Sequence, residues 1–478
     1  SGVGGLYQSD LILPNNMNDS IVKERGDNVQ IAQNQVLNIF TRLKESLLKL
    51  FSKEKEEKLP LADIFFVHLY LSDLNMFVPI NQIYCQFFGT CPPSRSCLQV
   101  DLPTGVFVAL DIQLLCGSYI NSIPLKPRTQ NTIREVLHVQ GRSEWAPQCI
   151  GPYSQANSIH QSLIFVAGQI PLDPATMLLL EPENIEELTN PMQFPLLSLT
   201  LCLRHADRVI TSMGSSSRGS LCCTVYINKS HSHFTMWDNH DFYKLTNQVE
   251  NMTKNLLNCG VEQSIVDQED VESLSLSSCS VLVVYMPQLP KGSIVEVEII
   301  AARSQKGEID MFKFPFSHIL HKQIQIDTSD SMSFQNPHHS DTWEVWNNNS
   351  GSFIKAVQEE MYDDKDLNMN MMGLVDIFCS FLPRSYCFGI ISMKKGTNDL
   401  ITLKNLIILS LRKLMNAAEL STLNLSCLRV YYIQDYFSFD CLTLKAFIES
   451  IILGIEIPII VLPVPLIKSG VFMEIQVI

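Results

Sequence analysis

The chain has 478 residues, which is too long for one compact core and predicts about three domains of roughly 100 to 200 residues each. Its 35 Lys and Arg residues against 49 Asp and Glu residues give a formal charge of −14, which opposes attraction to a phosphate backbone, so we expect no nucleic-acid partner. Fourteen cysteines scattered among apolar residues exclude a small secreted disulfide scaffold and predict buried, reduced thiols in a cytoplasmic protein.

The ends of the chain carry two further expectations. The sequence begins at Ser1 without a methionine, which predicts a fragment whose natural N-terminus lies upstream. The longest apolar run, 451–467, contains Glu456 and three prolines. A membrane-spanning helix does not readily accommodate that combination, so we expect strands and turns there and no membrane partner.

The hydrophobic periodicity repeats one order of elements three times along the chain: a long amphipathic helix, a strand, a second helix and two strands. In the first copy these elements are expected at 29–50, 64–71, 76–88, 94–100 and 105–115. In the second copy they follow a hairpin at 149–182 and are expected at 193–213, 221–227, 242–257, 278–286 and 292–302. In the third copy they follow a hairpin at about 372–394 and are expected at 400–420, 427–433, 442–453, 457–462 and 470–478.

The repeats predict an α+β fold of tandem units. The middle strands, 67–71, 224–228 and 429–433, are rich in aromatic and β-branched residues, which suits mixed sheets covered on one face by helices. A leading hairpin for the first copy is missing or degenerate within 1–20. We therefore divide the chain into a first unit at 1–117, a linker at 118–142, a second unit at 143–303, a linker or mobile loop at 304–350 and a degenerate third unit at 351–478.

Three short motifs carry the functional signal. The hairpin at 149–176 combines a tight turn at Gly151 and Pro152, a strand, and Gly168 at a point where only a hydrogen fits. The first copy closes with P-S-R-S-C at 93–97 and L-P-T-G at 102–105. The second copy carries L-P-K-G at 289–292, followed closely by Glu296.

These motifs resemble those of the RidA/YjgF family, whose members have a chorismate mutase-like fold and are imine and enamine deaminases or ligand-binding relatives. The resemblance implies two catalytic residues, Arg95, which grips the carboxylate of a 2-imino acid through two parallel donors, and Glu296, which positions the hydrolytic water. It also implies that Tyr153, Gly168 and Cys97 line the ligand pocket. A structural alternative for Arg95 is an ion pair with an acidic group at a domain contact.

Neither of the first two copies holds the complete set of residues. In the second copy, Val281 and Val283 occupy the positions of the arginine and the cysteine. In the first copy, Ala109 stands where the second has its glutamate, and in the third copy Glu474 aligns ambiguously. Three histidines at 231, 233 and 240 lie in a polar loop with irregular spacing, which is typical of exposed residues, so we expect no metal site.

Family members form homotrimers with ligand sites between subunits, and this leads to a hypothesis about the fused copies. Three copies in one chain would form an intramolecular pseudotrimer rather than a homotrimer. One composite site would then combine Arg95 of the first copy with Tyr153, Gly168 and Glu296 of the second. The alternative is that both halves have decayed into scaffold.

Residues 145–157, which read W-A-P-Q-C-I-G-P-Y-S-Q-A-N, resemble the C-terminal region of eukaryotic diphthine–ammonia ligases. In that family an N-terminal ATP-pyrophosphatase domain activates diphthine on elongation factor 2 for amidation to diphthamide. Its phosphate-binding signature, S-G-G-K-D-S, does not occur in this sequence. We therefore expect ATP as the cofactor of a missing N-terminal domain and no cofactor in this chain.

The two resemblances imply an accessory module that supplies ammonia to the ligase or acts as a scaffold. The expected partners are elongation factor 2 and a small carboxylated imino compound. The alternative is a stand-alone RidA-type 2-imino or enamine deaminase, or a non-catalytic metabolite-binding module. An endoribonuclease activity fits poorly with the acidic charge and the lack of a basic patch among aromatic residues.

Overall fold

The computed structural model describes residues 25–51, 60–115, 134–159, 162–182, 190–259, 279–303, 320–324, 375–382, 386–394, 400–417, 428–433, 441–451, 459–468 and 471–477. Among these residues, no helix is both long enough and apolar enough to cross a membrane. The expected first hairpin within 1–20 lies outside the described residues.

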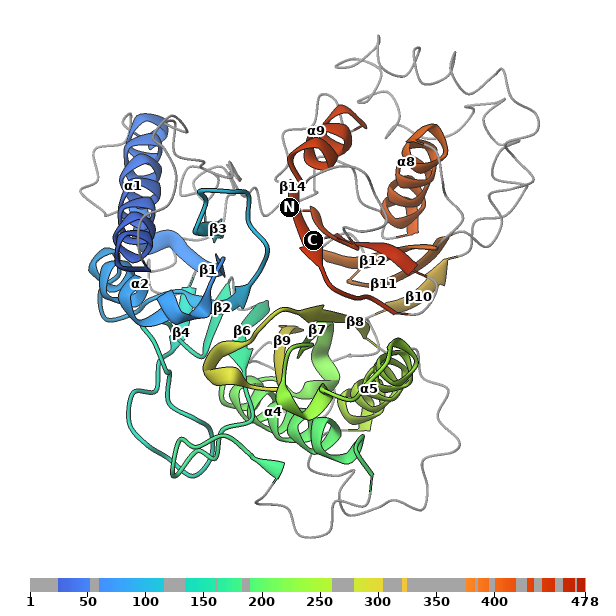
Figure 1. Ribbon diagram of the computed structural model, residues 1–478, viewed down its shortest axis with the longest axis horizontal. Helices are drawn as coiled ribbons and strands as arrows, with labels where there is room; N and C mark the ends of the chain where they lie inside the picture. Colours follow the sequence, from blue (N-terminus) through green and yellow to red (C-terminus); the bar gives the residue numbers. More distant parts are fainter. Residues whose placement is uncertain are drawn as a thin grey trace, which may run out of the picture.

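The described chain forms three mixed β-sheets with helices, an α+β architecture (Figure 1). The first sheet has the strand order β2-β1-β3. With its helices it comprises, in chain order, α1 (Arg25–Phe51), β1 (Ile64–Leu71), α2 (Phe77–Tyr84), β2 (Ser94–Gln99) and β3 (Val108–Leu114). The second sheet, of order β4-β5-β6-β9-β7-β8, comprises β4 (Arg134–Leu137), β5 (Ala156–Ile159), β6 (Leu163–Gln169), α4 (Gln193–Ser212), β7 (Ser220–Asn228), α5 (Asn239–Cys259), β8 (Ser280–Met286) and β9 (Val295–Ala302).

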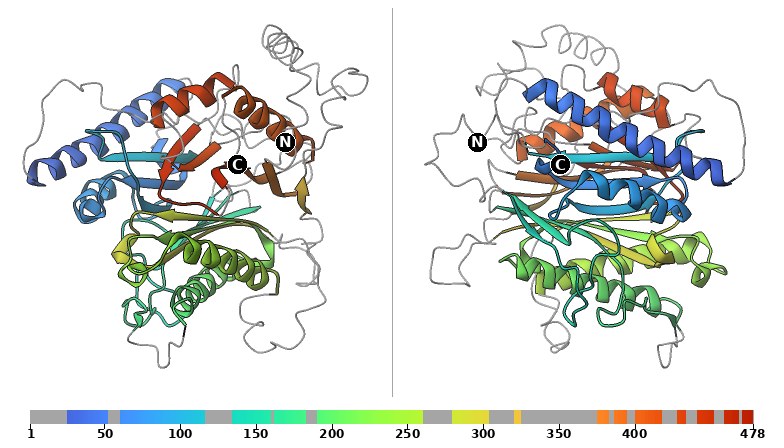
Figure 2. Two further views of the ribbon diagram at one scale, coloured as in Figure 1. Left: turned by 45° about the vertical axis from the view of Figure 1, so that its right-hand side comes forward. Right: turned by 90° about the vertical axis from the view of Figure 1, so that its left-hand side faces the viewer.

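The third sheet has the order β10-β11-β12-β15-β13-β14, which matches the order of the second. Its elements are β10 (Leu320–Ile324), β11 (Val375–Leu382), β12 (Tyr386–Lys394), α8 (Leu400–Ala417), β13 (Leu428–Ile433), α9 (Cys441–Ile451), β14 (Ile459–Val464) and β15 (Val471–Val477). In Figure 1 the three sheets face a common centre and the helices lie on the outside, and Figure 2 shows α4 and α5 covering the outer face of the second sheet. Helices and strands therefore lie close to the positions that the periodicity predicts.

The same pairing recurs in each sheet. The strands β1, β7 and β13 run parallel to β2, β8 and β14 and antiparallel to β3, β9 and β15. Each carries a buried tyrosine, and the residues opposite Tyr70, Tyr226 and Tyr431 are Ala109, Glu296 and Glu474. The register thus gives Glu474 an unambiguous place, because it stands where the second sheet has Glu296.

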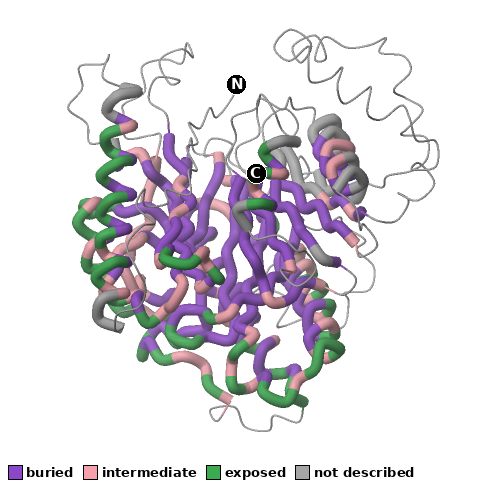
Figure 3. Tube along the Cα trace, turned by 45° about the horizontal axis from the view of Figure 1, so that its top comes forward, coloured by how far each residue is buried: buried purple, intermediate pink, exposed green. Residues whose placement is uncertain are grey.

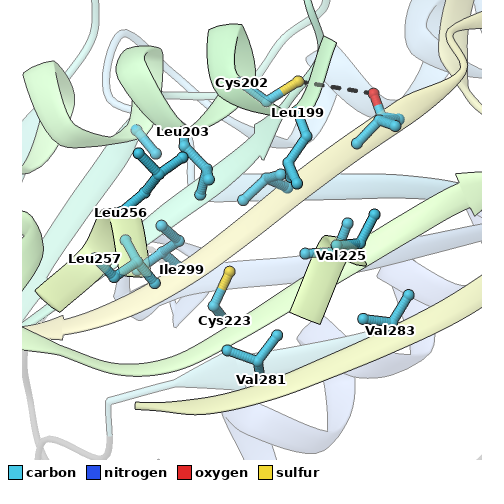
Figure 4. Close-up of a cluster of buried hydrophobic side chains, with 14 of the residues drawn as sticks. Leu199, Cys202, Leu203, Cys223, Val225, Leu256, Leu257, Val281, Val283 and Ile299 are labelled. Atoms are coloured by element: carbon cyan, nitrogen blue, oxygen red, sulfur yellow. Dashed lines mark hydrogen bonds between the residues drawn. The ribbon is translucent and has the colours of Figure 1, made fainter. Parts of the chain in front are cut away.

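Helix α4 forms because its apolar residues recur every three or four positions and make one buried stripe. Leu199, Cys202 and Leu203 of this stripe pack over the strands that carry Val225 and Val283 (Figure 4). Burial of one such leucine side chain stabilises the fold by about 1.5 to 3 kcal/mol. The thiol of Cys202 donates to the Val295 carbonyl at 3.8 Å, so this cysteine is a reduced core residue, as the composition predicts.

Two segments interpreted as linkers contain short strands. Residues 134–137, within the expected linker 118–142, form β4 and pair with β5. Residues 320–324, within the expected linker or mobile loop 304–350, form β10 and pair with β11. Both are edge strands that pair with only one neighbouring strand in the described part of the chain. Their sequences, R-E-V-L and L-H-K-Q-I, lack the alternation of apolar and polar residues that predicts a strand.

An apolar cluster joins the three sheets where they meet. Its members come from all three sheets and include Tyr70 and Leu98, Tyr226 and Leu282, and Tyr431 and Leu462. Figure 3 shows these inner strands as buried, while exposed residues gather on the outer helices. The centre of the molecule is therefore a core shared by sheets that lie far apart in the sequence.

Beside this core lies a buried polar group that we name the axial cluster, comprising His68, Ser96, Asp111, Thr224, Glu298, Arg429 and Gln476. His68 Nε2 lies 2.7 Å from Glu298 Oε2, and His68 Nδ1 lies 3.3 Å from Asp111 Oδ2. The guanidinium of Arg429 donates to Asp111 Oδ2 at 2.8 Å through both Nε and one terminal nitrogen. Two carboxylates thus face a histidine and an arginine in the interior.

The axial cluster makes stability depend on pH. Burial and the Arg429 charge lower the pKa of His68, but Glu298 and Asp111 outweigh them, so this pKa is raised above its ordinary 6.5. Burial raises the pKa of Asp111, but Arg429 and His68 bring it down to about 2, and the pKa of Glu298 is lowered below 4.5 despite burial. The carboxylates lose their contribution as pH falls through their folded pKa values, and His68 loses its contribution as pH rises through its own. The cluster therefore contributes fully between roughly pH 4.5 and 6.5.

We expect the replacement His68→Gln to lower the melting temperature most in this window. The gap between the wild type and the variant should narrow as pH rises from 6.5 through the raised pKa of folded His68, because the imidazole is deprotonated first in the unfolded state and then in the folded state. Thermal unfolding followed by circular dichroism from pH 4.5 to 9 measures the gap. His138→Gln is the control, since burial lowers the pKa of His138 and its gap should change in the opposite sense, widening as pH rises to about 6.5 and staying flat above it. A constant gap for His68→Gln would contradict the expectation.

Candidate functional site

The candidate site lies where the first sheet meets the second, at a contact that we name the first seam. Strand β2 forms its first-sheet side, and the start of the β5–β6 hairpin forms the other side (Figure 1). Ser94 and Ser154 form a parallel bridge, and the Ser154 hydroxyl donates to the Pro92 carbonyl at 2.6 Å. Asn157 Nδ2 donates to Ser94 Oγ at 2.8 Å. These contacts fix the position of β2 along its length relative to the second sheet, and therefore which β2 side chains face that sheet.

Arg95 of β2 is buried in this seam within three aromatic rings, which we name the aromatic cage. The guanidinium carbon lies 4.6 Å from the ring centroid of Tyr84, 5.3 Å from that of Tyr153 and 5.5 Å from that of Phe77. Two of the rings come from α2 and the third from the turn before β5. Cation–π contacts of this kind are worth about 0.5 to 2 kcal/mol each, so the cage offsets part of the cost of burying the charge.

The guanidinium of Arg95 has no acidic partner in the described part of the chain. Only 2% of the residue is exposed, and neither of its terminal nitrogens has a hydrogen-bond partner of good geometry among those residues. The alternative interpretation, an ion pair at a domain contact, finds no acidic partner among the described residues. A buried cation with free donors is expensive, and such groups in folded proteins are usually matched by an anion or by water.

Gly151 closes over the guanidinium. A Cβ atom at this position would lie 2.7 Å from a terminal nitrogen of Arg95 and 3.1 Å from Asn81 Nδ2. A side chain here would displace the arginine, so the backbone turn before Pro152 can approach the charge only because residue 151 is a glycine.

Glu296 of β9 reaches the same seam from the second sheet. Only 2% of it is exposed, and its carboxyl accepts a hydrogen bond from the backbone N–H of Cys97. Burial raises the pKa of Glu296 well above its ordinary value, Glu298 raises it further, and Arg95 and the Cys97 amide offset only part of the rise. The raised pKa of Glu296 favours its protonated form, which can donate a proton.

Strand β6 makes room for Glu296 by an irregularity at Gly168. The pairing of β6 with β9 shifts register between Val166 and Gln169, as it does at a β-bulge. A Cβ atom on Gly168 would overlap the Glu296 carboxyl. The glycine is thus explained by the carboxyl beside it, whereas the sequence motif assigns it to ligand contact.

We expect Gly168→Ala to lower the free energy of unfolding by about 1 to 3 kcal/mol, the usual cost of overpacking a buried site. Gly89→Ala is the matched control, because a Cβ atom there meets nothing within 4 Å, and it should change stability little. Chemical denaturation measures both variants. Equal stability of the two variants would show that the Glu296 carboxyl moves aside freely.

Cys97 lies behind this pair of residues as a neutral thiol. It is buried, and burial raises its pKa to about 12 in spite of the nearby Arg95 charge. A protonated thiol is a poor nucleophile, so the position suits a wall of the site and not covalent chemistry.

The structure brings together all five residues that the sequence singles out: Arg95, Cys97, Tyr153, Gly168 and Glu296. Sequence reasoning missed Tyr84 and Phe77, which complete the cage. Their helix reads as an ordinary amphipathic helix, and nothing in its pattern tells an aromatic residue that packs on a charge from one that packs in a core. At the matching place in the third sheet, Glu474 accepts from Ser392 Oγ at 2.8 Å and pairs with Lys468 at 3.4 Å.

An open cavity of about 400 Å³ lies on the other side of the Gly151 turn. Its lining comes from both sides of the seam: Cys85, Phe88, Gly89, Pro92, His138, Gln140, Cys149, Gly151 and Pro152. Arg95 does not line the cavity, because the turn at 151–152 stands between them. The charged groups of the site are thus assembled but covered in this conformation.

The three loop histidines lie elsewhere, on the second sheet's outer side. The His231 ring accepts from the His233 backbone at 3.1 Å, and His233 Nε2 lies 2.7 Å from the Pro191 carbonyl. Both rings pack among Phe194, Phe234 and Trp237. In the described ranges, no three His, Cys, Asp or Glu side chains converge as metal ligands would.

The sequence matches no family model. It is 32% identical over 166 residues to the diphthine–ammonia ligase of Schizosaccharomyces pombe, a match that covers 34% of this chain and 23% of the relative. It is 29% identical over 209 residues to the diphthine–ammonia ligase of Saccharomyces cerevisiae, covering 41% of this chain and 26% of that relative. The chain thus spans about a quarter of the length of these curated relatives.

Small single-unit proteins also match about one third of the chain. A RutC family protein of Pyrococcus abyssi is 28% identical over 159 residues, covering 33% of this chain and 92% of its own. Among solved structures, RidA of an Antarctic Psychrobacter is 21% identical with a TM-score of 0.23, covering 34% of this chain and 99% of its own. The YjgF gene product of E. coli is 20% identical with a TM-score of 0.24, covering 36% and 99%. Structural likeness at these scores transfers no function.

Proposed function

We propose that this chain is the RidA-like region of a diphthine–ammonia ligase, built of three tandem units that form one pseudotrimer within the chain. The partial matches to two ligases support the assignment, and the repeated strand order of the sheets supports the three units. In this proposal the ATP-dependent amidation of diphthine on elongation factor 2 belongs to another part of the same cytoplasmic protein, and this region needs no cofactor. Its role is to supply ammonia or to act as a scaffold for elongation factor 2.

We propose further that the first seam binds the carboxylate of a small imino acid. The observation that carries this is the buried guanidinium of Arg95, which lacks an acidic partner among the described residues and keeps two terminal nitrogens free of hydrogen bonds there. A guanidinium presents parallel donors that match the two oxygens of a carboxylate. A bound carboxylate would neutralise the charge and satisfy both nitrogens at once.

Binding requires the turn at 151–152 to move. The cavity of about 400 Å³ and the guanidinium lie on opposite sides of this turn, so a ligand would enter through the cavity and reach Arg95 when the turn lifts. The cavity offers a mixed lining with Phe88, two prolines, His138 and Gln140, and among the described residues no Asp, Glu, Lys or Arg lines it. This lining suits the uncharged part of a small organic acid.

The chemistry that the site supports is hydrolysis of a carbon–nitrogen double bond. Water adds to the imine carbon, the protonated carboxyl of Glu296 donates a proton to the nitrogen, and its carboxylate takes a proton from the added water. In the resulting carbinolamine, Glu296 gives its proton to the amino nitrogen and takes the proton of the hydroxyl, so the carbon–nitrogen bond breaks as the carbon–oxygen double bond forms, and the products are a 2-oxo acid and ammonia. The high pKa of Glu296 favours this role. A purely binding or scaffold role is the second candidate, favoured by the covered position of Arg95.

The test generates a 2-imino acid in the assay with an amino-acid oxidase and follows its loss and the release of ammonia. Catalysis predicts a faster loss with the wild-type chain and the uncatalysed rate with Glu296→Gln. Calorimetric titration with a stable 2-oxo acid measures binding separately. Binding without faster loss supports the sensor or scaffold role, and neither binding nor faster loss overturns the proposal for the first seam.

A further inference from the structure

The three sheets present unlike side chains at equivalent positions where they meet. Two residues before the shared tyrosine, β1, β7 and β13 carry His68, Thr224 and Arg429. The residues opposite them on the antiparallel strands are Asp111, Glu298 and Gln476. All six are at most 3% exposed. At these equivalent positions the first sheet therefore carries a histidine and a carboxylate, the second a hydroxyl and a carboxylate, and the third a guanidinium and an amide.

Each pair of sheets shares one polar contact through these side chains. The first and second sheets are joined by His68 and Glu298, whose atoms lie 2.7 Å apart. The third and first are joined by Arg429 and Asp111 at 2.8 Å. The third and second are joined by Gln476 Nε2, which donates to Thr224 Oγ1 at 3.2 Å. The set closes a ring in which two cationic groups balance two carboxylates.

The ring is balanced only when each sheet occurs once. Three copies of the second sheet would bring together three Glu298 carboxylates with no cation among these positions. Three copies of the third would bring together three Arg429 guanidiniums. Buried like charges repel strongly in a low-dielectric interior, and a buried charge without a partner is costly.

We infer that the axial faces of the three sheets are complementary surfaces that select one another by charge, so that the chain closes on itself and rejects a sheet from a second copy. The apolar cluster around Tyr70, Tyr226 and Tyr431 stabilises the contact between the sheets without distinguishing one sheet from another. The axial cluster determines which sheet packs against which, because polar contacts across an interface contribute to specificity more than to affinity. The inference rests on the proposed three-unit arrangement and makes no use of the Arg95 site.

The experiment refolds the full chain from denaturant at rising protein concentration and measures the mass distribution by size exclusion with light scattering. Two double variants neutralise one contact each and leave the remaining charges balanced: Asp111→Asn with Arg429→Gln, and His68→Gln with Glu298→Gln. Lys445→Gln is the control, because Lys445 pairs with Glu449 on the outer helix α9. The wild type and the control are expected to refold as monomers at every concentration.

The double variants are expected to fold, as judged by far-UV circular dichroism, and to give at least a threefold larger fraction of exchanged oligomers at the highest concentration. Folded variants that stay as monomeric as the wild type overturn the inference. Failure of both double variants to fold also overturns it, because selection requires that the neutral faces still pack. A wild-type chain that is itself oligomeric refutes the three-unit arrangement instead, and the titration of the Arg95 site is unaffected by any of these outcomes.

Discussion

Replacement of Arg95 by alanine is expected to abolish ligand binding and any imine hydrolysis while leaving the fold intact. A carboxylate held by two charge-assisted hydrogen bonds gains about 3 to 5 kcal/mol, so its loss corresponds to a weakening of roughly 10²- to 10⁴-fold. Stability should change little, because the substitution removes a buried charge that has no acidic partner among the described residues. The measurements are calorimetric titration with a 2-oxo acid and thermal unfolding of the same preparation.

Two further variants make the Arg95 result specific. Arg95→Lys keeps the charge but offers one point of contact instead of a fork, so it should bind more weakly than the wild type and more tightly than the alanine variant. Arg134→Ala removes another arginine of the same seam, which donates to Asn157 Oδ1 and to two backbone carbonyls outside the cage. It should lower stability and keep binding. Equal loss of binding in Arg134→Ala would show that binding depends on the integrity of the seam and not on the guanidinium of Arg95.

Replacement of Arg429 by glutamine is expected to cause the largest loss of stability, about 3 to 5 kcal/mol, which is the usual cost of breaking a buried ion pair. The change leaves Asp111 buried at 2% exposure with His68 as its remaining cationic contact. It also removes the anchor of Gln476, whose Oε1 accepts from Arg429 at 3.1 Å. Denaturant unfolding followed by fluorescence measures the effect.

The partner variant tests the cause of this loss. Asp111→Asn in the Arg429→Gln background removes the stranded charge and should recover at least half of the lost stability. Lys445→Gln breaks a pair with Glu449 one turn along helix α9 and should cost less than about 1 kcal/mol. A double variant no more stable than Arg429→Gln alone would show that packing of the arginine, and not its charge, holds the sheets together.

Much of the fold could be predicted from the sequence because the spacing of apolar residues along the chain differs between helices and strands. The strands β7, β8 and β13 lie within a residue or two of the expected ranges. The edge strands β4 and β10 could not be predicted, because strands held on one side tolerate polar sequences without alternation. The second helix of the first unit was predicted as one piece over 76–88, but only 77–84 is α-helical.

The candidate site was predicted in its residue types and only partly in its surroundings. The motifs identified Arg95 and Glu296, but they did not show that Arg95 lacks an acidic partner among the described residues, because a sequence motif does not specify which distant side chains surround a residue. Tyr84 completes the cage from a helix whose pattern is that of any buried amphipathic segment. The pKa of Glu296 likewise depends on burial and on Glu298, which a motif does not encode.

The order of elements, the α+β class and the residue types at the seam follow from the sequence alone, because these depend on neighbours within a few positions along the chain. Packing in three dimensions was needed to show that Arg95 is caged without an acidic partner among the described residues, and that His68, Asp111, Glu298 and Arg429 balance one another at the centre. The pairs that do so are separated by 230 residues for His68 and Glu298 and by 318 for Asp111 and Arg429. Local patterning fixes which face of an element is buried, whereas the partner of a buried charge is chosen by how distant elements pack.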